Sequence, residues 1–271
     1  MAIELLLAIF FLFIGLEIAA TIAHPKALII PSAAALSGMV VPALIFLAIS
    51  PSTHLWAAAM PTDLAIALGG LALVGKGIRP QVRTFLLLLA VADDFFSLLI
   101  FGAIYGSRLH LADSLSTLGA ALVGFALGQI KILQPARLIP ILNPLTTFFI
   151  VPVYVIYQVR SGFSTEITNG TTLGFLAARV VGKVLGIALF IWMAHRLKWI
   201  IAGSGISLNE SVGVGLLAGS AMTVSLVIGE IAAQSPSEMD QLRSGVFLSP
   251  IISVILGSMW LRFRGRVRAS E

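Results

Sequence analysis

The chain has 271 residues, of which 58% are hydrophobic and 11% are charged, and its net charge is +5 at pH 7. Soluble domains carry about 25% charged residues, so this composition excludes a water-soluble globular protein and predicts an all-α polytopic membrane protein. The lack of cysteine excludes disulfides and cysteine-ligated metal sites, and the four histidines lack the spacing of a helical metal site. Neither an enzyme nor a bound cofactor is expected.

Apolar stretches of about 20 residues, the length that crosses a bilayer, recur along the whole chain. They lie near residues 3–22, 27–49, 55–75, 82–106, 112–132, 140–159, 171–195, 207–234 and 240–262. The first stretch lacks the basic residues that begin a secretion signal, so we interpret it as a retained helix. The sequence therefore predicts nine spans in a single transmembrane domain, residues 1–271.

Basic residues are distributed unevenly between the loops that join these spans. Of the 17 lysines and arginines, twelve fall on one side and three on the other, while Arg179 and Lys183 lie inside a span. Cytoplasmic loops carry the excess of basic residues, which places the C-terminus in the cytoplasm and the N-terminus outside a cell membrane. This distribution explains the positive net charge, so no nucleic-acid partner is expected.

The span at residues 55–75 contains residues that interrupt a helix. Pro61 removes a backbone donor and disfavours helical geometry at the preceding residue. Thr62 and Asp63 have side chains that can cap a new helix start. Broken backbone at membrane depth is tolerated where it is buried in protein or lines a wet cavity. A simple proline kink is the alternative, but the neighbouring Asp63 favours a functional break.

Two adjacent aspartates, Asp93 and Asp94, interrupt the otherwise apolar span at residues 82–106. An ionisable group near the bilayer centre costs about 3 kcal/mol on insertion scales, and such groups usually mark an ion or proton path. Neighbouring helix positions lie about 100° apart, so the two carboxylates cannot share a direction. We expect one to face Lys183 and the other to face an aqueous path.

The span at residues 207–234 also contains a weakened stretch. Its small residues come just before Thr223 and Ser225, and they are Gly213, Gly215, Gly219 and Ser220. Close helix packing is the alternative reason for such glycines. Interrupted spans in both halves of a chain indicate inverted repeats, here at residues 27–106 and 171–262, with linking helices at 107–170.

Several segments, which cover most of the chain in order, carry a family resemblance. They are AIFFLFIGLE, SGMVVPALIFLA, PTDLAIALGGLALVG, AVADDFFSLLIFGAIY, GKVLGIALFIWMAHRLK and GLLAGSAMTVSLVIG. The chain thereby resembles the NhaA-type sodium/proton antiporters, a family built from inverted repeats. The resemblance implies exchange of sodium, and also lithium, for protons, which maintains cellular pH and sodium levels.

The resemblance also implies roles for individual residues. Asp94 resembles the carboxylate that binds sodium or a proton, and Asp93 resembles its neighbour, which also belongs to the sodium site and pairs with a buried lysine, here Lys183. Asp63 resembles the acid at the crossing of two broken helices. Thr62 and Thr223 would line the two breaks. Crossed half-helices leave dipole ends of both signs, which Asp63 and Lys183 could balance.

Arg179 and Glu17 are further ionisable residues inside spans. Arg179 precedes Lys183 by one helical turn, where the family has an apolar residue; it could pair with an aspartate, but its place near the outer end of the helix favours extension to the membrane surface. Glu17 lies near the cytoplasmic end of its helix, which favours a solvated carboxylate.

The chain departs from the family in length. Relative to the family it is expected to lack the first helix, the following β-hairpin and two central helices between Tyr105 and Leu115. A homodimer would therefore form without the hairpin. Two alternatives to sodium/proton exchange stay open: a transporter of the same fold for another solute, such as an organic anion, and a shortened regulatory membrane protein that does not transport.

Overall fold

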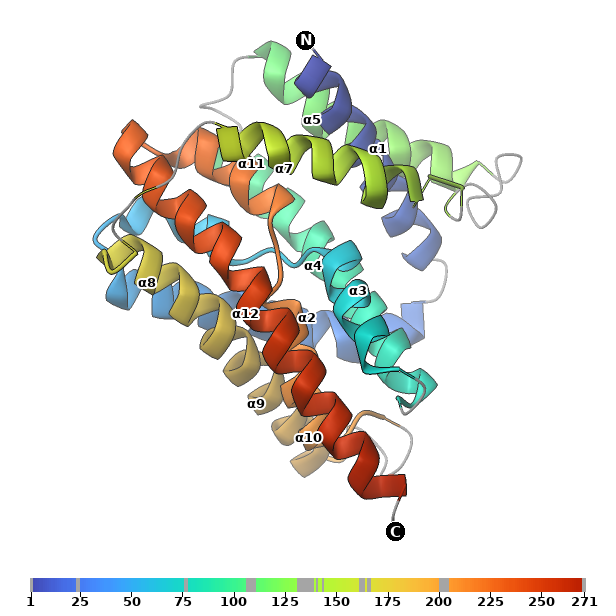
Figure 1. Ribbon diagram of the computed structural model, residues 1–271. Coiled ribbons are helices and arrows are strands. Elements are labelled where there is room, and N and C mark those ends of the chain that lie inside the picture. Colours follow the sequence, from blue (N-terminus) through green and yellow to red (C-terminus); the bar gives the residue numbers. More distant parts are fainter. Residues whose placement is uncertain are drawn as a thin grey trace.

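The computed structural model describes residues 2–22, 25–75, 78–105, 111–130, 139, 141–142, 144–160, 164, 167–199 and 205–269. All regular structure within these ranges is helical, which confirms the predicted all-α membrane fold (Figure 1). The helices are α1 (Ala2–Ile22), α2 (Pro25–Ile49), η1 (Thr53–Ala59), α3 (Leu64–Val74), α4 (Pro80–Tyr105), α5 (Leu111–Gln129), η3 (Thr146–Ile150), α7 (Val151–Arg160), α8 (Gly170–Leu176), η4 (Ala177–Gly182), α9 (Lys183–Arg196), α10 (Leu208–Ala218), α11 (Thr223–Ala232) and α12 (Pro236–Ala269).

In these ranges, single long helices and bent pairs of shorter helices are both long enough to span a membrane. The long apolar helices are Leu28–Ile49, Pro80–Ile104, Gly170–Arg196 and Pro236–Phe263. Two further spans are each made of a bent pair of shorter helices. The apolar helices Leu5–Ala20 and Gly119–Gln129 are shorter, and several predicted loops lie outside the described residues, so the number of nine spans stays a prediction.

Both predicted interruptions are confirmed. The axes of η1 and α3 meet at 52°, and those of α10 and α11 meet at 54°. Pro61 lies in the first break, as expected. The second break is confined to residues 219–222, so Gly213 and Gly215 lie within α10 and do not interrupt it.

Close packing explains these two glycines, which corrects the expectation that they weaken the helix. A Cβ atom on Gly215 would lie 2.7 Å from the Val184 Cα atom of α9, and one on Gly213 would lie 2.5 Å from the Leu261 side chain of α12. Membrane helices approach one another most closely where small residues face the partner. The glycines therefore bring α10 against its neighbours, and the helix ends beyond them.

The half-helices on either side of the breaks pack into different parts of the core. η1 contacts α11, and their apolar residues belong to one buried cluster that includes Ala58 and Leu226. α3 contacts α10, and their residues belong to a second cluster that includes Ala67 and Leu217. The two breaks therefore lie between two apolar clusters, where polar groups are enclosed on both sides.

A separate group of helices covers one end of the molecule. α1 packs along α5, and η3, which continues into α7, contacts α1 near the top of Figure 1. Gly15 of α1 faces the Ala121 backbone, and Gly124 of α5 faces the Leu12 backbone, so that a Cβ atom at either glycine would overlap the opposite helix. α1 also contacts α4, and this contact brings Glu17 toward the breaks.

Candidate ion-binding site at the crossing of two helix breaks

The two breaks are joined directly through their backbones. The Asp63 amide donates a hydrogen bond to the Ser220 carbonyl oxygen, with an N···O distance of 3.0 Å. Asp63 has extended dihedral angles, φ −100° and ψ 106°, which free its amide from helical pairing. Each break thus satisfies a backbone group of the other, as buried polar groups require.

The Asp63 side chain points across the crossing instead of capping its own helix. Asp63 occupies the N-cap position of α3, yet it makes no side-chain capping bond, contrary to the expected role of a cap. Its Oδ2 atom accepts a hydrogen bond from the Thr223 hydroxyl at 3.1 Å. Both α3 and α11 begin at this point, and their N-terminal ends carry partial positive charge that stabilises an anion between them.

Lys183 and Asp93 form a buried ion pair, as predicted from the resemblance. The Lys183 Nζ atom lies 2.5 Å from Asp93 Oδ2, and both side chains are fully buried. Thr62 joins the pair: its hydroxyl donates to Asp93 Oδ2, accepts from Lys183 Nζ at 2.9 Å and lies 3.0 Å from the Ala218 carbonyl oxygen. One Thr62 hydrogen cannot serve both acceptors at once, so these contacts alternate or share the proton.

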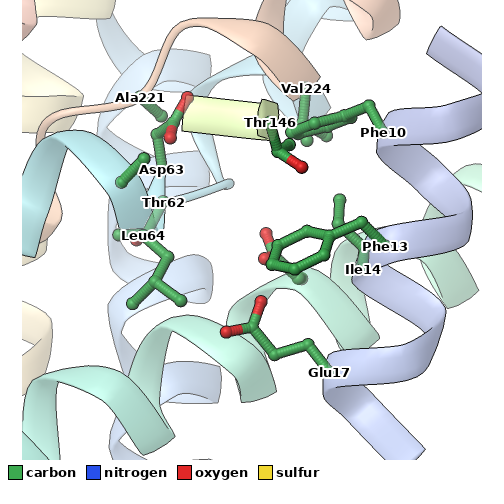
Figure 2. A pocket seen from close by; sticks show the side chains of 12 residues that line it. Phe10, Phe13, Ile14, Glu17, Thr62, Asp63, Leu64, Thr146, Ala221 and Val224 are labelled. Carbon is green, nitrogen blue, oxygen red and sulfur yellow. The ribbon is translucent and has the colours of Figure 1, made fainter. Parts of the chain in front are cut away.

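Asp94 faces a different environment from its neighbour. It lines a cavity of about 30 Å³, together with Asp63, Glu17, Thr62 and Thr146 (Figure 2). Within the part of the chain that the structure describes, no hydrogen bond to the Asp94 carboxylate is present. The expectation that the two aspartates point apart is therefore confirmed.

Glu17 of α1 does not lie at the surface, where it was expected. Its side chain is buried and reaches from α1 toward the cavity, with Asp63 on the opposite side (Figure 2). The prediction of a solvated carboxylate is wrong because α5 and α4 pack against α1 and cover this part of the helix. An ionisable residue inside a membrane span usually marks a functional site, and Glu17 carries that signal as the aspartates do. Its place near a helix end led to the wrong prediction.

Arg179 is also placed differently from the prediction. It is fully buried and does not extend to the membrane surface. Its guanidinium donates hydrogen bonds to the Ala58 carbonyl oxygen at 3.0 Å, to the Pro61 carbonyl oxygen and to the Ser225 hydroxyl. These carbonyl oxygens become available to Arg179 only when the first span breaks and folds against it, so no sequence pattern predicted them as partners.

The cavity has a size and a lining that suit a small cation. A volume of roughly 10–15 Å³ holds one water molecule, so a cavity of about 30 Å³ can hold a small ion with water. Its polar side chains carry carboxylate and hydroxyl oxygens, the ligands that hard cations prefer, and its other seven lining residues are apolar. Among the described residues there is no cluster of three or more histidine, aspartate or glutamate side chains that could hold a resident metal ion.

The comparisons with known proteins agree with this architecture. The sequence matches the family described as Na+/H+ antiporter 1 over residues 1–142 and 133–261. It is 30% identical to the Na(+)/H(+) antiporter NhaA of Escherichia coli, over 97% of this chain and 83% of that protein. It is 30% identical to the protein of the same name from Citrobacter koseri, over 96% of this chain and 82% of that protein.

A third relative is the Na(+)/H(+) antiporter NhaA 1 of Klebsiella pneumoniae, at 29% identity over 96% of this chain and 81% of that protein. The alignment with it extends over 321 positions, which exceeds the 271 residues of the chain. The relative therefore contains internal residues that have no counterpart here, as expected for a shortened chain.

Proposed function

The chain belongs to the Na+/H+ antiporter 1 family, and from this membership and the geometry of the cavity we propose that it exchanges sodium ions for protons across the cell membrane. The observation that carries the proposal is the cavity at the crossing of the breaks, lined by Asp94 and Asp63. Lithium is expected to replace sodium there, because both are small, hard cations.

Asp94 is the proposed exchange group. A carboxylate can hold either a proton or a metal cation, but the two compete for the same oxygen atoms. Sodium that enters the cavity therefore displaces the proton, and a proton displaces sodium when the cavity opens to the opposite side. No covalent step is needed, because the competition itself couples the two ions.

Asp63, Thr62 and Thr223 would complete the site around that carboxylate. The Asp63 carboxylate lies at the N-terminal ends of two half-helices, and Thr223 holds it there. Thr62 lines the cavity and also contacts the pair of Asp93 and Lys183. Asp93 would thus support the sodium site through this shared threonine and keep Lys183 in place.

Transport requires that the cavity open alternately to the two sides of the membrane. Paired broken helices support such a mechanism, because one helix bundle can rock against another around a central site. In the orientation that the basic residues indicate, Glu17 lies on the cytoplasmic side of the breaks, and the exchange would help to control cytoplasmic pH and sodium. The start of α1 and the end of α12 lie at opposite ends of the molecule in Figure 1. This supports an external N-terminus and a cytoplasmic C-terminus.

Transport of an organic anion loses its main support. The two buried cations, Arg179 and Lys183, do not line the cavity, and each is bonded to protein oxygen atoms. An anion would meet carboxylates there instead. A regulatory protein that does not transport would not need buried carboxylates around a cavity. A flux measurement on the purified protein distinguishes such a protein from a transporter.

The test is ion-driven pH change in proteoliposomes that contain only this protein. Sodium or lithium added outside should move protons in the opposite direction, and potassium should be less effective. The variant Asp94→Asn should abolish the response, while Asp240→Asn, which changes an aspartate that pairs with Arg243 at the start of α12, should retain it. Unchanged exchange in Asp94→Asn would reject Asp94 as the exchange group.

A further inference from the structure

Arg179 lies where the long helix of residues 170–196 is wound differently from its neighbouring turns. The segment η4, residues 177–182, is π-helical, whereas α8 before it and α9 after it are α-helical. Such π-helical turns are rare and frequently occur at functional sites. Arg179 points inward from this segment, and its guanidinium carbon lies 5.0 Å from the centre of the Phe175 ring.

The hydrogen bonds of Arg179 reach both breaks. Ala58 lies at the C-terminal end of η1, where carbonyl oxygens lack helical partners and carry partial negative charge, and Pro61 follows in the break. Ser225 belongs to the first turn of α11, two residues after Thr223, whose hydroxyl binds Asp63. The planar guanidinium can serve several acceptors at once, which a lysine ammonium on a flexible stem cannot do with the same geometry.

Lys183 has a different set of partners. Its ammonium bonds to Asp93 and Thr62, and among the described residues it makes no hydrogen bond to a carbonyl oxygen at a helix end. At the first break, Arg179 and not Lys183 contacts the carbonyl oxygens whose negative charge has to be balanced. The charged groups that act on Arg179 are Asp93 and Asp63, neither of which bonds to it, and Lys183 one turn further along the same helix.

We propose that Arg179 is a positioning residue of the exchange site, which joins the end of η1 and the first turn of α11 to the helix that carries Lys183. The two breaks then move as one unit with that helix when the cavity changes its exposure. Arg179 itself binds no transported ion, because it is a cation, its two terminal nitrogen atoms donate to protein oxygen atoms and it does not line the cavity. This inference rests on the proposed function and adds the part that holds the site together.

The first experiment measures sodium-driven exchange in proteoliposomes for Arg179→Lys and Lys183→Gln. Arg179→Lys keeps the positive charge but cannot serve the three acceptors together, so we expect the maximal rate to fall about tenfold or more. The KM for sodium should stay within about twofold, because the cavity lining is unchanged. Lys183→Gln should instead change the KM, because it releases Asp93. Val181→Ala, an exposed change on the same π-helical segment, should resemble the unmodified protein.

The second experiment measures backbone hydrogen exchange, which does not depend on transport. Arg179→Lys should accelerate exchange at both breaks, residues 58–63 and 220–226, whereas Val181→Ala should not. If Arg179→Lys does not fold, Ser225→Ala removes one acceptor only and should still accelerate exchange in the second break.

The outcomes separate the two proposals. A maximal rate and hydrogen exchange in Arg179→Lys equal to those of the unmodified protein would overturn the positioning role. Unmodified protein that moves no protons in response to sodium would overturn the proposed function, and hydrogen exchange would then decide the role of Arg179 independently.

Discussion

At the residue scale, the adjacent aspartates show how one helical step separates two tasks. Asp93 points toward Lys183 and is fully buried with it, whereas Asp94 points into the cavity that Glu17 and Asp63 also line. The two side chains differ by about 100° in direction around α4, which is enough to reach different neighbours. A carboxylate held in an ion pair and a carboxylate that lines the cavity therefore stand side by side.

Thr223 should contribute to stability through its bond to Asp63. Thr223→Val removes the hydroxyl donor with little change in shape, and a hydrogen bond to a charged group contributes about 1.5–3 kcal/mol. We expect a lower unfolding temperature in detergent solution. Thr53→Val, an exposed change at the start of η1, is the matched control and should unfold like the unmodified protein. Equal unfolding temperatures for both variants would show that the bond to Asp63 contributes little.

Glu17 should affect the apparent affinity for sodium. Glu17→Gln removes a negative charge from the cavity wall, so electrostatic attraction for a cation should weaken and the KM for sodium should rise several-fold. The measurement is the rate of exchange at a series of sodium concentrations. Glu230→Gln, on an exposed part of α11, serves as the control. A KM that is the same in Glu17→Gln and in the control would contradict this role.

At the element scale, the broken helices are held in place by close contacts on either side of each break. Gly215 lets α10 approach α9, and η4 lets Arg179 reach η1. Pro61 explains why the first span stops, but the crossing itself is formed by the bond between Asp63 and Ser220. The two breaks are therefore joined to each other through a backbone hydrogen bond.

The glycines of the half-helices should differ sharply in their tolerance of a side chain. A methyl group at Gly215 meets the α9 backbone, and overpacking typically lowers stability by about 1–3 kcal/mol. Gly69 of α3 has open space around it, so Gly69→Ala should be neutral or stabilise the helix by up to about 1 kcal/mol. Thermal unfolding of the two alanine variants should show a clear loss for Gly215→Ala only. The packing role of Gly215 would be wrong if both variants unfolded together.

At the scale of the whole molecule, the half-helices divide the core into two apolar clusters with the ionisable groups between them. Arg79, which precedes α4, also links two segments that are distant in the sequence. It forms a two-pronged ion pair with Glu210 in the first turn of α10.

The orientation in the membrane can be tested cleanly because the chain contains no cysteine. Ser235 and Lys198 are exposed and lie on opposite sides in the predicted topology. In intact cells, a thiol reagent that cannot cross membranes should label Ser235→Cys, while Lys198→Cys should react only after permeabilisation. The reverse pattern would invert the predicted orientation and would move Glu17 to the outer side of the breaks.

The sequence by itself determined the membrane class and the two interrupted spans, although the second break is shorter than its glycines predicted. Long apolar stretches, a proline beside an aspartate and charges inside spans are local features, and in a bilayer each has few physical solutions. The NhaA-type resemblance supplied the pairing of Asp93 with Lys183 and the expectation for Asp94. Neither source predicted that Glu17 would join the cavity.

Only the tertiary structure decided where Glu17 and Arg179 point. Glu17 is enclosed because α4 and α5 pack against its helix, and Arg179 finds its partners in carbonyl oxygens that a break elsewhere in the chain leaves free. Such partners are backbone atoms more than 100 positions away, and their availability depends on how two broken helices cross. A linear pattern of residue types contains no information about that crossing, so the direction of a buried charge is fixed only when the helices assemble.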